Sequence, residues 1–258
     1  MMMLRDMAQF DRTHAQTLER IWFLGDVHGQ FTHIAQALRH SSAPPRWLVF
    51  LGDIEIDHRP FQEILAPLQR NYPDIRVAFI HGNHDADTHH HWQMLHDCGD
   101  ASTLHGQVLD LDGVQVAGLG GNFLGKIWRP PEDPSFLNQR MAVRRSPYPW
   151  RGEGAPDAHH PKLLAAIFPD DVKALSRQRA DILVTHEAPS CHPHGFIALD
   201  ELARSMQVVR TFHGHHHDDR SDAYALERES LGFDARAVSY CSIKNGLGEV
   251  IHAGEVGW

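Results

Sequence analysis

Five short motifs along the chain carry side chains that bind cations or move protons. In chain order they read Gly25-Asp26-Val27-His28, Gly52-Asp53, Gly82-Asn83-His84-Asp85, Thr185-His186 and Gly214-His215-His216-His217. Seven of their side chains are candidate metal ligands: Asp26, His28, Asp53, Asn83, His186, His215 and His217. Oxygen and imidazole ligands in one set suit Mn²⁺, Fe or Zn²⁺ rather than a soft thiolate site. Seven ligands are too many for one ion and fit two ions with open positions, bridged by Asp53, an arrangement known for phosphoryl hydrolysis.

Each motif follows an apolar run of strand length. Residues 21–24, 47–51 and 75–80 are short runs without alternation, which is typical of strands covered on both faces. Apolar residues at helical spacing follow each of the three runs. Repeated strand, turn and helix units predict an α/β sheet, in which functional groups collect at the carboxyl ends of the strands. Two more predicted strands, 182–185 and 208–212, end in the histidine motifs.

The pattern changes in the remaining segments. Asp112-Gly113 lies between two apolar runs and predicts a β-hairpin. Further helices are expected at 162–168, 170–178 and 198–206, and further strands around 224–226, 235–240 and 249–251. Residues 1–20 read as a loose helix or N-terminal arm, and residues 122–160 as a long loop or lid insertion. The chain shows neither an internal repeat nor a clear linker, so residues 1–258 are predicted to form one domain.

The composition argues against several classes of protein. The formal net charge is −9, which is unfavourable for a dedicated nucleic-acid binder because a phosphate backbone needs a basic surface. Three widely spaced cysteines imply neither a disulfide framework nor a Cys-rich zinc site. The apolar runs are too short for a signal peptide or a membrane span. We therefore expect a cytoplasmic protein without a membrane partner. The 22 histidines are unusually many, and a subset of them is expected to bind metal.

The order and spacing of the five motifs resemble those of the calcineurin-like metallophosphoesterase family. The resemblance spans positions 25 to 217, and its strength comes from the ordered match, since each motif alone is weak. It implies a four-layer α/β/β/α sandwich with two mixed β-sheets and a dinuclear metal site at one edge.

The resemblance also implies a role for each motif residue. The first metal would be held by Asp26, His28 and His217. The second metal would be held by Asn83, His186 and His215, and Asp53 would bridge the two. A hydroxide that bridges the metals would attack phosphorus in line, and His84 would protonate the leaving alkoxide or donate to the phosphoryl oxygen. Asp85 is predicted to support catalysis by orienting His84, or to cap the helix that follows.

The chain departs from the serine/threonine protein phosphatases of this family, which carry Gly-Asp-x-x-Asp-Arg-Gly and Gly-Asn-His-Glu. Ile56 occupies the position of the second aspartate, three residues after Asp53. The usual carboxylate partner of the catalytic histidine is therefore missing there, and Glu55, Asp57 and Asp85 are the alternatives. The arginines that would bind the phosphate group of a phosphoprotein are also missing from their usual places.

A metal-dependent phosphoesterase acting on a small phosphomonoester or phosphodiester is the leading hypothesis, with two ions of Mn, Fe or Zn as cofactors. The alternative is a nuclease of the same fold, which the acidic balance and the lack of a Lys/Arg-rich segment disfavour. A third hypothesis is a non-catalytic scaffold. Such a protein would have lost the catalytic histidine or several ligands, whereas His84 and the expected ligands are all present.

Overall fold

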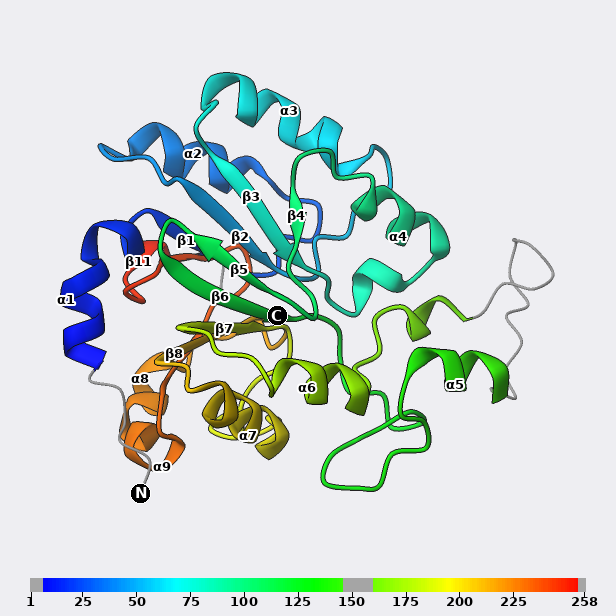
Figure 1. Ribbon diagram of the computed structural model, residues 1–258. Helices are drawn as coiled ribbons and strands as arrows, with labels where there is room; N and C mark the ends of the chain where they lie inside the picture. The colour runs from blue at the N-terminus through cyan, green and yellow to red at the C-terminus, as the bar shows by residue number, and fades with distance from the viewer. Residues whose placement is uncertain (1–6, 146–159, 255–258) are drawn as a thin grey trace.

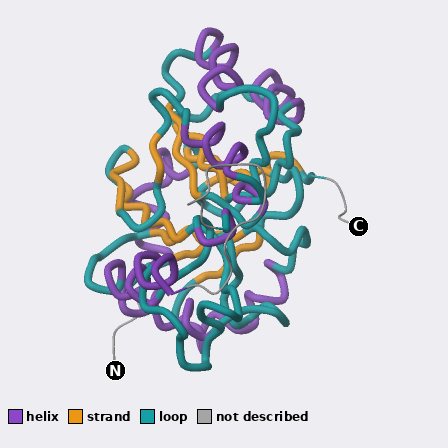
Figure 2. Tube along the Cα trace, turned by 90° about the vertical axis from the view of Figure 1, so that its right-hand side faces the viewer, coloured by secondary structure: helices purple, strands orange, loops and turns teal. Residues whose placement is uncertain are grey.

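Two β-sheets lie face to face between layers of helices in the computed structural model, which describes residues 7–145 and 160–254 (Figure 1). In the view of Figure 2 the strands occupy the middle of the molecule, with helices above and below them. Both sheets contain parallel and antiparallel pairs. The predicted α/β fold with two mixed sheets is therefore confirmed.

The first sheet, sheet A, has the strand order β11-β10-β1-β2-β3-β4. Its parallel strands are β1 (Ile21–Leu24), β2 (Trp47–Leu51), β3 (Arg76–Ile80) and β4 (Ser102–Thr103). Antiparallel strands β10 (Ile243–Asn245) and β11 (Val250–His252) complete it beside β1. The apolar runs correctly predicted β1, β2 and β3, whereas β4 and β10 were not expected.

The second sheet, sheet B, has the strand order β5-β6-β7-β8-β9. Its strands are β5 (Val108–Leu111), β6 (Val114–Leu119), β7 (Ile182–Thr185), β8 (Arg210–His213) and β9 (Asp234–Ala237). The predicted hairpin joins β5 to β6. Asp112 and Gly113 have φ values of 57° and 94°, the left-handed conformation that a two-residue hairpin turn requires. The strands β6 to β9 are parallel, so β7 and β8 end at the same edge as each other.

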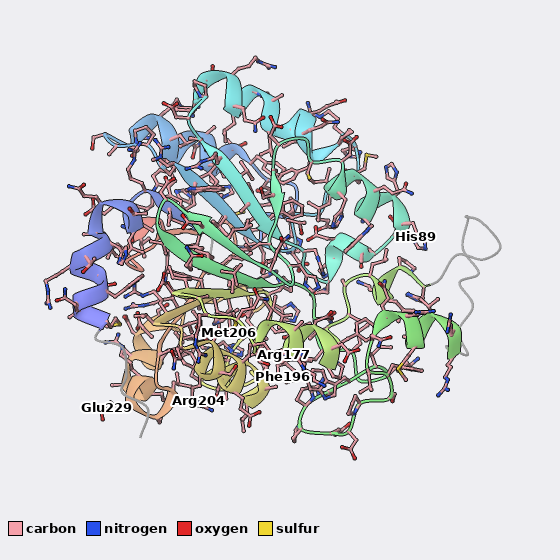
Figure 3. The ribbon with its side chains drawn as sticks, viewed as in Figure 1. His89, Arg177, Phe196, Arg204, Met206 and Glu229 are labelled. Carbon is pink, nitrogen blue, oxygen red and sulfur yellow. The ribbon has the colours of Figure 1, made fainter. Side chains whose placement is uncertain are left out.

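Successive side chains along the central strands point alternately to two apolar layers. One layer lies between the two sheets, and the other lies between each sheet and the helices that cover it. Phe23 of β1 stacks on Phe212 of β8 across the space between the sheets, with ring centroids 4.0 Å apart. The outer face of sheet A packs against α2 (Thr32–His40) and α3 (Phe61–Asn71). The outer face of sheet B packs against α6 (Pro169–Leu175) and α7 (Ile197–Met206). Figure 3 shows Phe196 and Met206 at the two ends of α7, below sheet B.

The remaining described helices lie around this sandwich. They are α1 (Met7–Leu18), α4 (His89–His96), α5 (Gln139–Arg145), α8 (Ser221–Tyr224) and α9 (Arg228–Leu231). Three 3₁₀ turns complete the described chain: η1 (His84–Ala86), η2 (Pro161–Leu163) and η3 (Ala225–Glu227). The predicted N-terminal arm is α1, which buries Phe10 and Leu18 against the sheets. None of the described helices has the length and apolarity needed to cross a membrane.

Two predicted elements are wrong. The expected strand around 224–226 is helical, because Tyr224 is buried as part of α8 against sheet B. The expected helix at 162–168 is only the 3₁₀ turn η2, after which residue 166 forms an isolated bridge to Asn122.

The predicted lid insertion, residues 122–160, is only partly described, since residues 146–159 lie outside the described residues. The described part contains α5 and contributes to a small apolar cluster that is separate from the layers around the sheets. Ile127 and Ala142 pack there against Phe168, with Trp128 and Phe136 at its margin.

Candidate metal centre

One group of ligand atoms joins the end of β1 to the end of β8. Asp26, His28 and His217 each offer an atom within 4.8 Å of the others. The Nε2 atom of His217 lies 3.3 Å from Oδ2 of Asp26 and 3.2 Å from Nε2 of His28. Since β1 belongs to sheet A and β8 to sheet B, this group combines residues of both sheets.

A second group joins the end of β2 to the ends of β7 and β8. Asp53, His186 and His215 again offer atoms within 4.8 Å of one another. Asn83, just after β3, adds its Oδ1 atom 3.1 Å from Nε2 of His186. This group also combines the two sheets. The structure thus brings all seven predicted ligands together in two groups, as the strand-end argument expected, while their binding of metal stays a prediction.

Asp53, a member of the second group, also lies close to the first. Its Oδ2 atom is 3.4 Å from Nε2 of His186 in the second group and 3.9 Å from Nε2 of His28 in the first. Its other oxygen accepts a hydrogen bond of 2.7 Å from the backbone N–H of His84. Burial raises the pKa of Asp53, but the neighbouring His186 outweighs this and holds that pKa below its ordinary value. Asp53 is therefore an ionised carboxylate placed where a bridging ligand would stand.

Two of the imidazoles have their Nδ1 atoms engaged by acceptors. The Nδ1–H of His186 donates to the carbonyl oxygen of Leu51 at 2.9 Å. The Nδ1–H of His28 donates to the carboxylate of Glu55 at 2.5 Å. An acceptor at Nδ1 fixes the tautomer and turns Nε2 toward a metal, the usual arrangement around metal-bound histidine.

The backbone is strained at several predicted ligands. His28, Asp53, His215 and His217 have φ values of 40°, 47°, 70° and 59°. The left-handed region is uncommon for residues other than glycine and costs on the order of 1–3 kcal/mol each. Strain of this kind clusters at functional sites, where the surrounding structure maintains it.

Two glycines allow the ligand loops to approach each other closely. A Cβ atom on Gly82 would lie 2.2 Å from Oδ1 of Asp53 and 2.5 Å from Cε1 of His186. Gly52 has φ +98°, and a Cβ atom there would lie 2.5 Å from Nδ1 of His186. Each glycine therefore keeps open the space that the buried carboxylate and imidazole occupy.

The charges in the site fit a cation. Asp26 is fully buried, and its Oδ1 atom has no hydrogen-bond partner among the described residues. Burial lowers the pKa of His186, but Asp53 and Asp26 outweigh it and raise that pKa to about 10. Burial lowers the pKa of His215 to about 3, so this imidazole is neutral and able to bind metal. The carboxylates thus attract positive charge, and a divalent cation would satisfy them in place of the proton on His186.

His84 lies beside the first group, with its ring centroid 5.6 Å from that of His28 and its side chain 45% exposed. Its Nδ1–H donates to Oδ2 of Asp87 at 2.9 Å. This corrects the sequence analysis, which offered Glu55, Asp57 and Asp85 as the partner carboxylate. Asp87 stands three residues after His84, the spacing that places two side chains together on a helical turn, so the signal was available.

Lys162 is the other site residue that sequence reasoning missed. Its Nζ atom donates to Oδ1 of Asp87 and, at 2.8 Å, to the carbonyl oxygen of Asn83. It comes from η2, on a segment distant in sequence from both partners. No pattern in the chain would have paired it with them.

Asp85 is buried, and its two oxygens accept from the backbone N–H groups of Glu55 and Gly82 at 2.7 and 2.8 Å. Burial, with the nearby charge of Asp53, raises the pKa of Asp85 to about 7. Its contacts therefore tie the loop after β2 to the turn after β3. The predicted part of Asp85 in catalysis stays a prediction.

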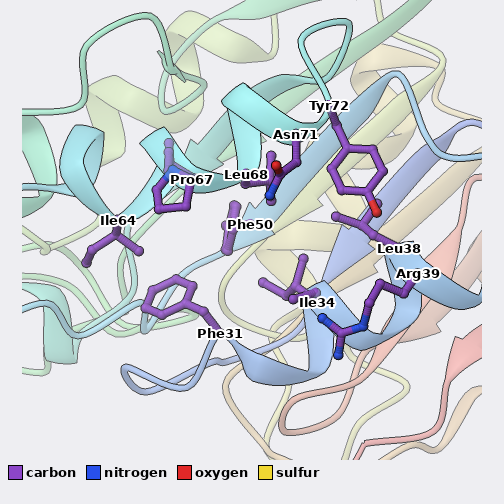
Figure 4. Close-up of a pocket in the computed structure, with 12 residues that line it drawn as sticks. Phe31, Ile34, Leu38, Arg39, Phe50, Ile64, Pro67, Leu68, Asn71 and Tyr72 are labelled. Carbon is purple, nitrogen blue, oxygen red and sulfur yellow. The ribbon is translucent and has the colours of Figure 1, made fainter.

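A separate apolar cavity of about 390 Å³ lies between α2 and α3 (Figure 4). Phe31, Ile34, Leu68 and Tyr72 are among the residues that line it. It contains no predicted ligand, so the chemistry of the strand ends does not extend into it.

Several known proteins are similar to this chain. An uncharacterised protein of Haemophilus influenzae is 38% identical over 222 residues, which cover 84% of this chain and 92% of that protein. Among solved structures, the protein TT1561 of Thermus thermophilus is similar at 12% identity and a TM-score of 0.49, covering 88% of this chain and 94% of that one. A 5′-nucleotidase from Candida albicans has 13% identity and a TM-score of 0.40, covering 87% of this chain and 46% of that one. At such scores, neither structure bears on the activity of this chain.

The model of the calcineurin-like phosphoesterase family matches residues 19–219. The matched segment contains all seven predicted ligands and His84, and the sandwich of two mixed sheets agrees with it. The chain therefore belongs to the calcineurin-like phosphoesterase family, whose members are metal-dependent hydrolases of phosphoric esters.

Proposed function

We propose that this chain is a dinuclear metallophosphoesterase that hydrolyses a small phosphomonoester or phosphodiester. The observation that carries the proposal is the pair of neighbouring ligand groups, in which Asp53 of the second group lies close to His28 of the first, with the partly exposed His84 next to them. Two groups that share a carboxylate between them match the donor arrangement of a two-metal site.

The ligands divide between two ions in this proposal. Asp26, His28 and His217 hold the first ion. Asn83, His186 and His215 would hold the second, and Asp53 would contribute to both. Bound divalent cations lower the pKa of water and stabilise the negative charge that develops on the transferred phosphoryl group. Mn²⁺, Fe²⁺ and Zn²⁺ all suit this mixed oxygen and nitrogen donor set.

His84 serves as the general acid. Its Nδ1 atom is engaged by Asp87, which leaves Nε2 on the other side of the ring to face the leaving-group oxygen. Its partly exposed side chain is accessible to a substrate, whereas Asp53 beside it is buried. General-acid assistance contributes typically ~10²–10⁴-fold to the rate.

A metal reconstitution experiment tests the proposal. The protein is stripped with a chelator and reloaded separately with Mn²⁺, Fe²⁺, Zn²⁺ and Mg²⁺. Each form is then assayed on an aryl phosphomonoester, linear and cyclic phosphodiesters, and dinucleoside polyphosphates. We expect chelation to abolish hydrolysis, at least one metal to restore it, and Asp53→Asn to remain inactive. The absence of turnover with every pairing of metal and ester would overturn the proposal.

Single-stranded DNA is included beside the small esters. Hydrolysis of DNA at a kcat/KM well above that of every small ester would replace the proposed substrate class with that of a nuclease.

A further inference from the structure

Three ionisable side chains, those of Lys162, Asp87 and His84, form a continuous chain of hydrogen bonds at the edge of the site. Lys162 donates to Oδ1 of Asp87, and Oδ2 of Asp87 accepts from Nδ1–H of His84 at 2.9 Å. Lys162 also donates to the carbonyl oxygen of Asn83 at 2.8 Å. Both oxygens of Asp87 are thus engaged, one by the histidine and one by the lysine.

The backbone of His84 is fixed more firmly than its ring. The backbone N–H donates to the buried Asp53, and its carbonyl oxygen accepts from the N–H of Asp87 at 3.1 Å, which closes η1. The side chain, in contrast, is 45% exposed. A half-exposed imidazole can rotate about two side-chain torsions, so a hydrogen bond at Nδ1 is an effective means of holding it in one orientation.

Asp87 needs a restraint of its own, because its side chain is one-third exposed. Lys162 supplies that restraint from η2, across a long separation in sequence. Figure 3 shows His89, two residues after Asp87, at the lower end of α4, where that helix begins. Partial burial raises the pKa of Asp87, but the hydrogen bonds from Lys162 and His84 outweigh it and hold that pKa below its ordinary value.

We infer that Asp87 and Lys162 are positioning residues for His84. Asp87 holds the imidazole with Nε2 toward the leaving group, and Lys162 holds Asp87 while bracing the backbone of Asn83. Ile56 stands where related enzymes carry the carboxylate that partners the histidine. In this chain Asp87, which follows His84 in sequence and is held by Lys162, would take the place of that carboxylate. This inference rests on the proposed function.

The step that the pair supports is a balanced proton transfer. A water molecule first loses one proton to the solvent, and the oxygen of the resulting hydroxide forms a bond to phosphorus. The bond from phosphorus to the leaving oxygen breaks, and its electron pair goes to that oxygen. The proton on Nε2 of His84 moves to the leaving oxygen. The ring is left neutral, with its Nδ1–H still bonded to the ionised Asp87.

A leaving-group series tests the inference. Asp87→Asn is compared with the wild type on a phosphate ester with a good leaving group, such as 4-nitrophenol, and on one with a poor, alkyl leaving group. We expect kcat for the ester with the poor leaving group to fall about a hundredfold, because a catalytic side chain displaced by about 1 Å loses about that much activity. It should change little for the good one, since a good leaving group needs no proton, and KM and metal content should stay near wild type. An equal loss on both esters, or no loss, would overturn the inference.

Lys162 is tested in the same assay. Lys162→Met should show a smaller loss with the same dependence on leaving group, and Lys162→Arg should recover most of the activity. The control is Asp112→Asn, which removes a similarly exposed carboxylate that also binds two cationic side chains, Arg46 and Arg76, at the β5–β6 turn. We expect that variant to match the wild type on both esters. Failure of Lys162→Arg to recover activity would remove Lys162 from the inference.

A spectroscopic readout separates this inference from the proposed function. The ¹⁵N ring signals of His84, identified by their loss in His84→Asn, are recorded at one pH in wild type and Asp87→Asn. We expect the Nδ1 signal to shift in Asp87→Asn but not in Asp112→Asn. If no ester is hydrolysed and the signal still shifts, the proposed function fails and the positioning by Asp87 stands. An unchanged Nδ1 signal would refute the positioning.

Discussion

The chemistry of this site depends on single side chains whose partners fix one ring nitrogen each. His28, His84 and His186 all have Nδ1 engaged by an acceptor: Glu55, Asp87 and the carbonyl oxygen of Leu51. In each case Nε2 is the nitrogen left for the site. Acceptors of this kind set both the tautomer and the direction of the ring, so their removal is expected to affect function without touching a ligand.

Replacing His84 with asparagine tests the acid itself. We expect kcat for a phosphate ester to fall about 10²–10⁴-fold because the proton donor is lost. The metal content, measured by mass spectrometry, should stay unchanged, since His84 belongs to neither ligand group. His40→Asn, on the exposed end of α2, serves as the control. Full activity in His84→Asn would rule out the assigned role.

Replacing Glu55 with glutamine tests the carboxylate behind His28. The substitution removes the negative charge of the carboxylate whose oxygen accepts the hydrogen bond of 2.5 Å from the Nδ1–H of His28. We expect affinity for the first metal to fall about 10–100-fold, the usual effect of losing a hydrogen-bond partner of a metal ligand. Calorimetric titration of the chelated protein measures this, with Glu63→Gln on α3 as the control. Equal affinities of the two variants would contradict the expectation.

The grouping of the seven predicted ligands was foreseeable, and the reason is local. Each predicted ligand follows a strand within a few residues, so residue type and position along the chain carried the information. Asp87 was missed because the carboxylates considered lie near Asp53 (Glu55 and Asp57) or directly after His84 (Asp85), and not one helical turn beyond His84. Lys162 could not have been found, because only the folded chain brings η2 to η1.

At the scale of elements, the turns after the strands position the predicted ligands, and Gly82 allows the turns after β2 and β3 to approach each other closely. Gly82→Ala would place a Cβ atom 2.2 Å from Oδ1 of Asp53. We expect activity to fall about a hundredfold, because a displacement of about 1 Å at a catalytic site has such an effect. Activity and metal content are measured beside Gly125→Ala, where a Cβ atom would meet nothing within 4 Å. Wild-type activity in Gly82→Ala would contradict the close approach.

Element prediction succeeded for the buried apolar strands of sheet A and failed for β10, in which polar residues are buried. The strands β1, β2 and β3 are short apolar runs, which are easily recognised. Strand β10 was missed because it contains Lys244, which reads as a surface residue. In the structure Lys244 is buried and donates to Ser221 and Asp219 at 2.9 and 2.6 Å. Its partners are distant in sequence, so its burial could not be inferred from the local pattern.

At the scale of the whole molecule, a buried ion cluster connects sheet B to both ends of the described chain. Arg210 of β8 donates to Asp234 of β9 at 2.7 Å, to Asp11 of α1 at 3.1 Å and to the carbonyl oxygen of Gly246 at 2.7 Å. Arg228 and Arg236 also donate to Asp234. Removing one partner of a buried pair leaves the other charge uncompensated.

We expect Asp234→Asn to lower the free energy of unfolding by about 3–5 kcal/mol at pH 7. Burial raises the pKa of Asp234, but Arg210 outweighs it and lowers that pKa below the ordinary 3.8. A lowered pKa stabilises the folded state above the ordinary value, and this stabilisation is lost as pH falls through the lowered pKa. The difference in stability between wild type and variant should therefore shrink below about pH 4. Denaturant titrations from pH 7 to about pH 3 measure it.

The exposed Asp112→Asn variant is the reference for those titrations. Its carboxylate meets two arginines at the protein surface, where an ion pair contributes only about 0–1 kcal/mol. If Asp234→Asn lowers the free energy of unfolding no more than Asp112→Asn does, burial does not increase the stabilisation that the ion cluster provides.

Each ligand group takes residues from both sheets, and this has a consequence for the stability of the fold. An ion held by Asp26 and His217, or by Asp53 and His186, would cross-link sheet A to sheet B at the site edge. Removing the metal should therefore lower the melting temperature, and restoring it at a hundred times Kd should return about 2.7 kcal/mol per ion. Differential scanning calorimetry with and without chelator measures this, and identical melting curves would exclude the cross-link. In a cell, the fraction of this protein that is folded would then follow the concentration of free cations. Metal starvation would therefore lower the amount of folded protein as well as its activity.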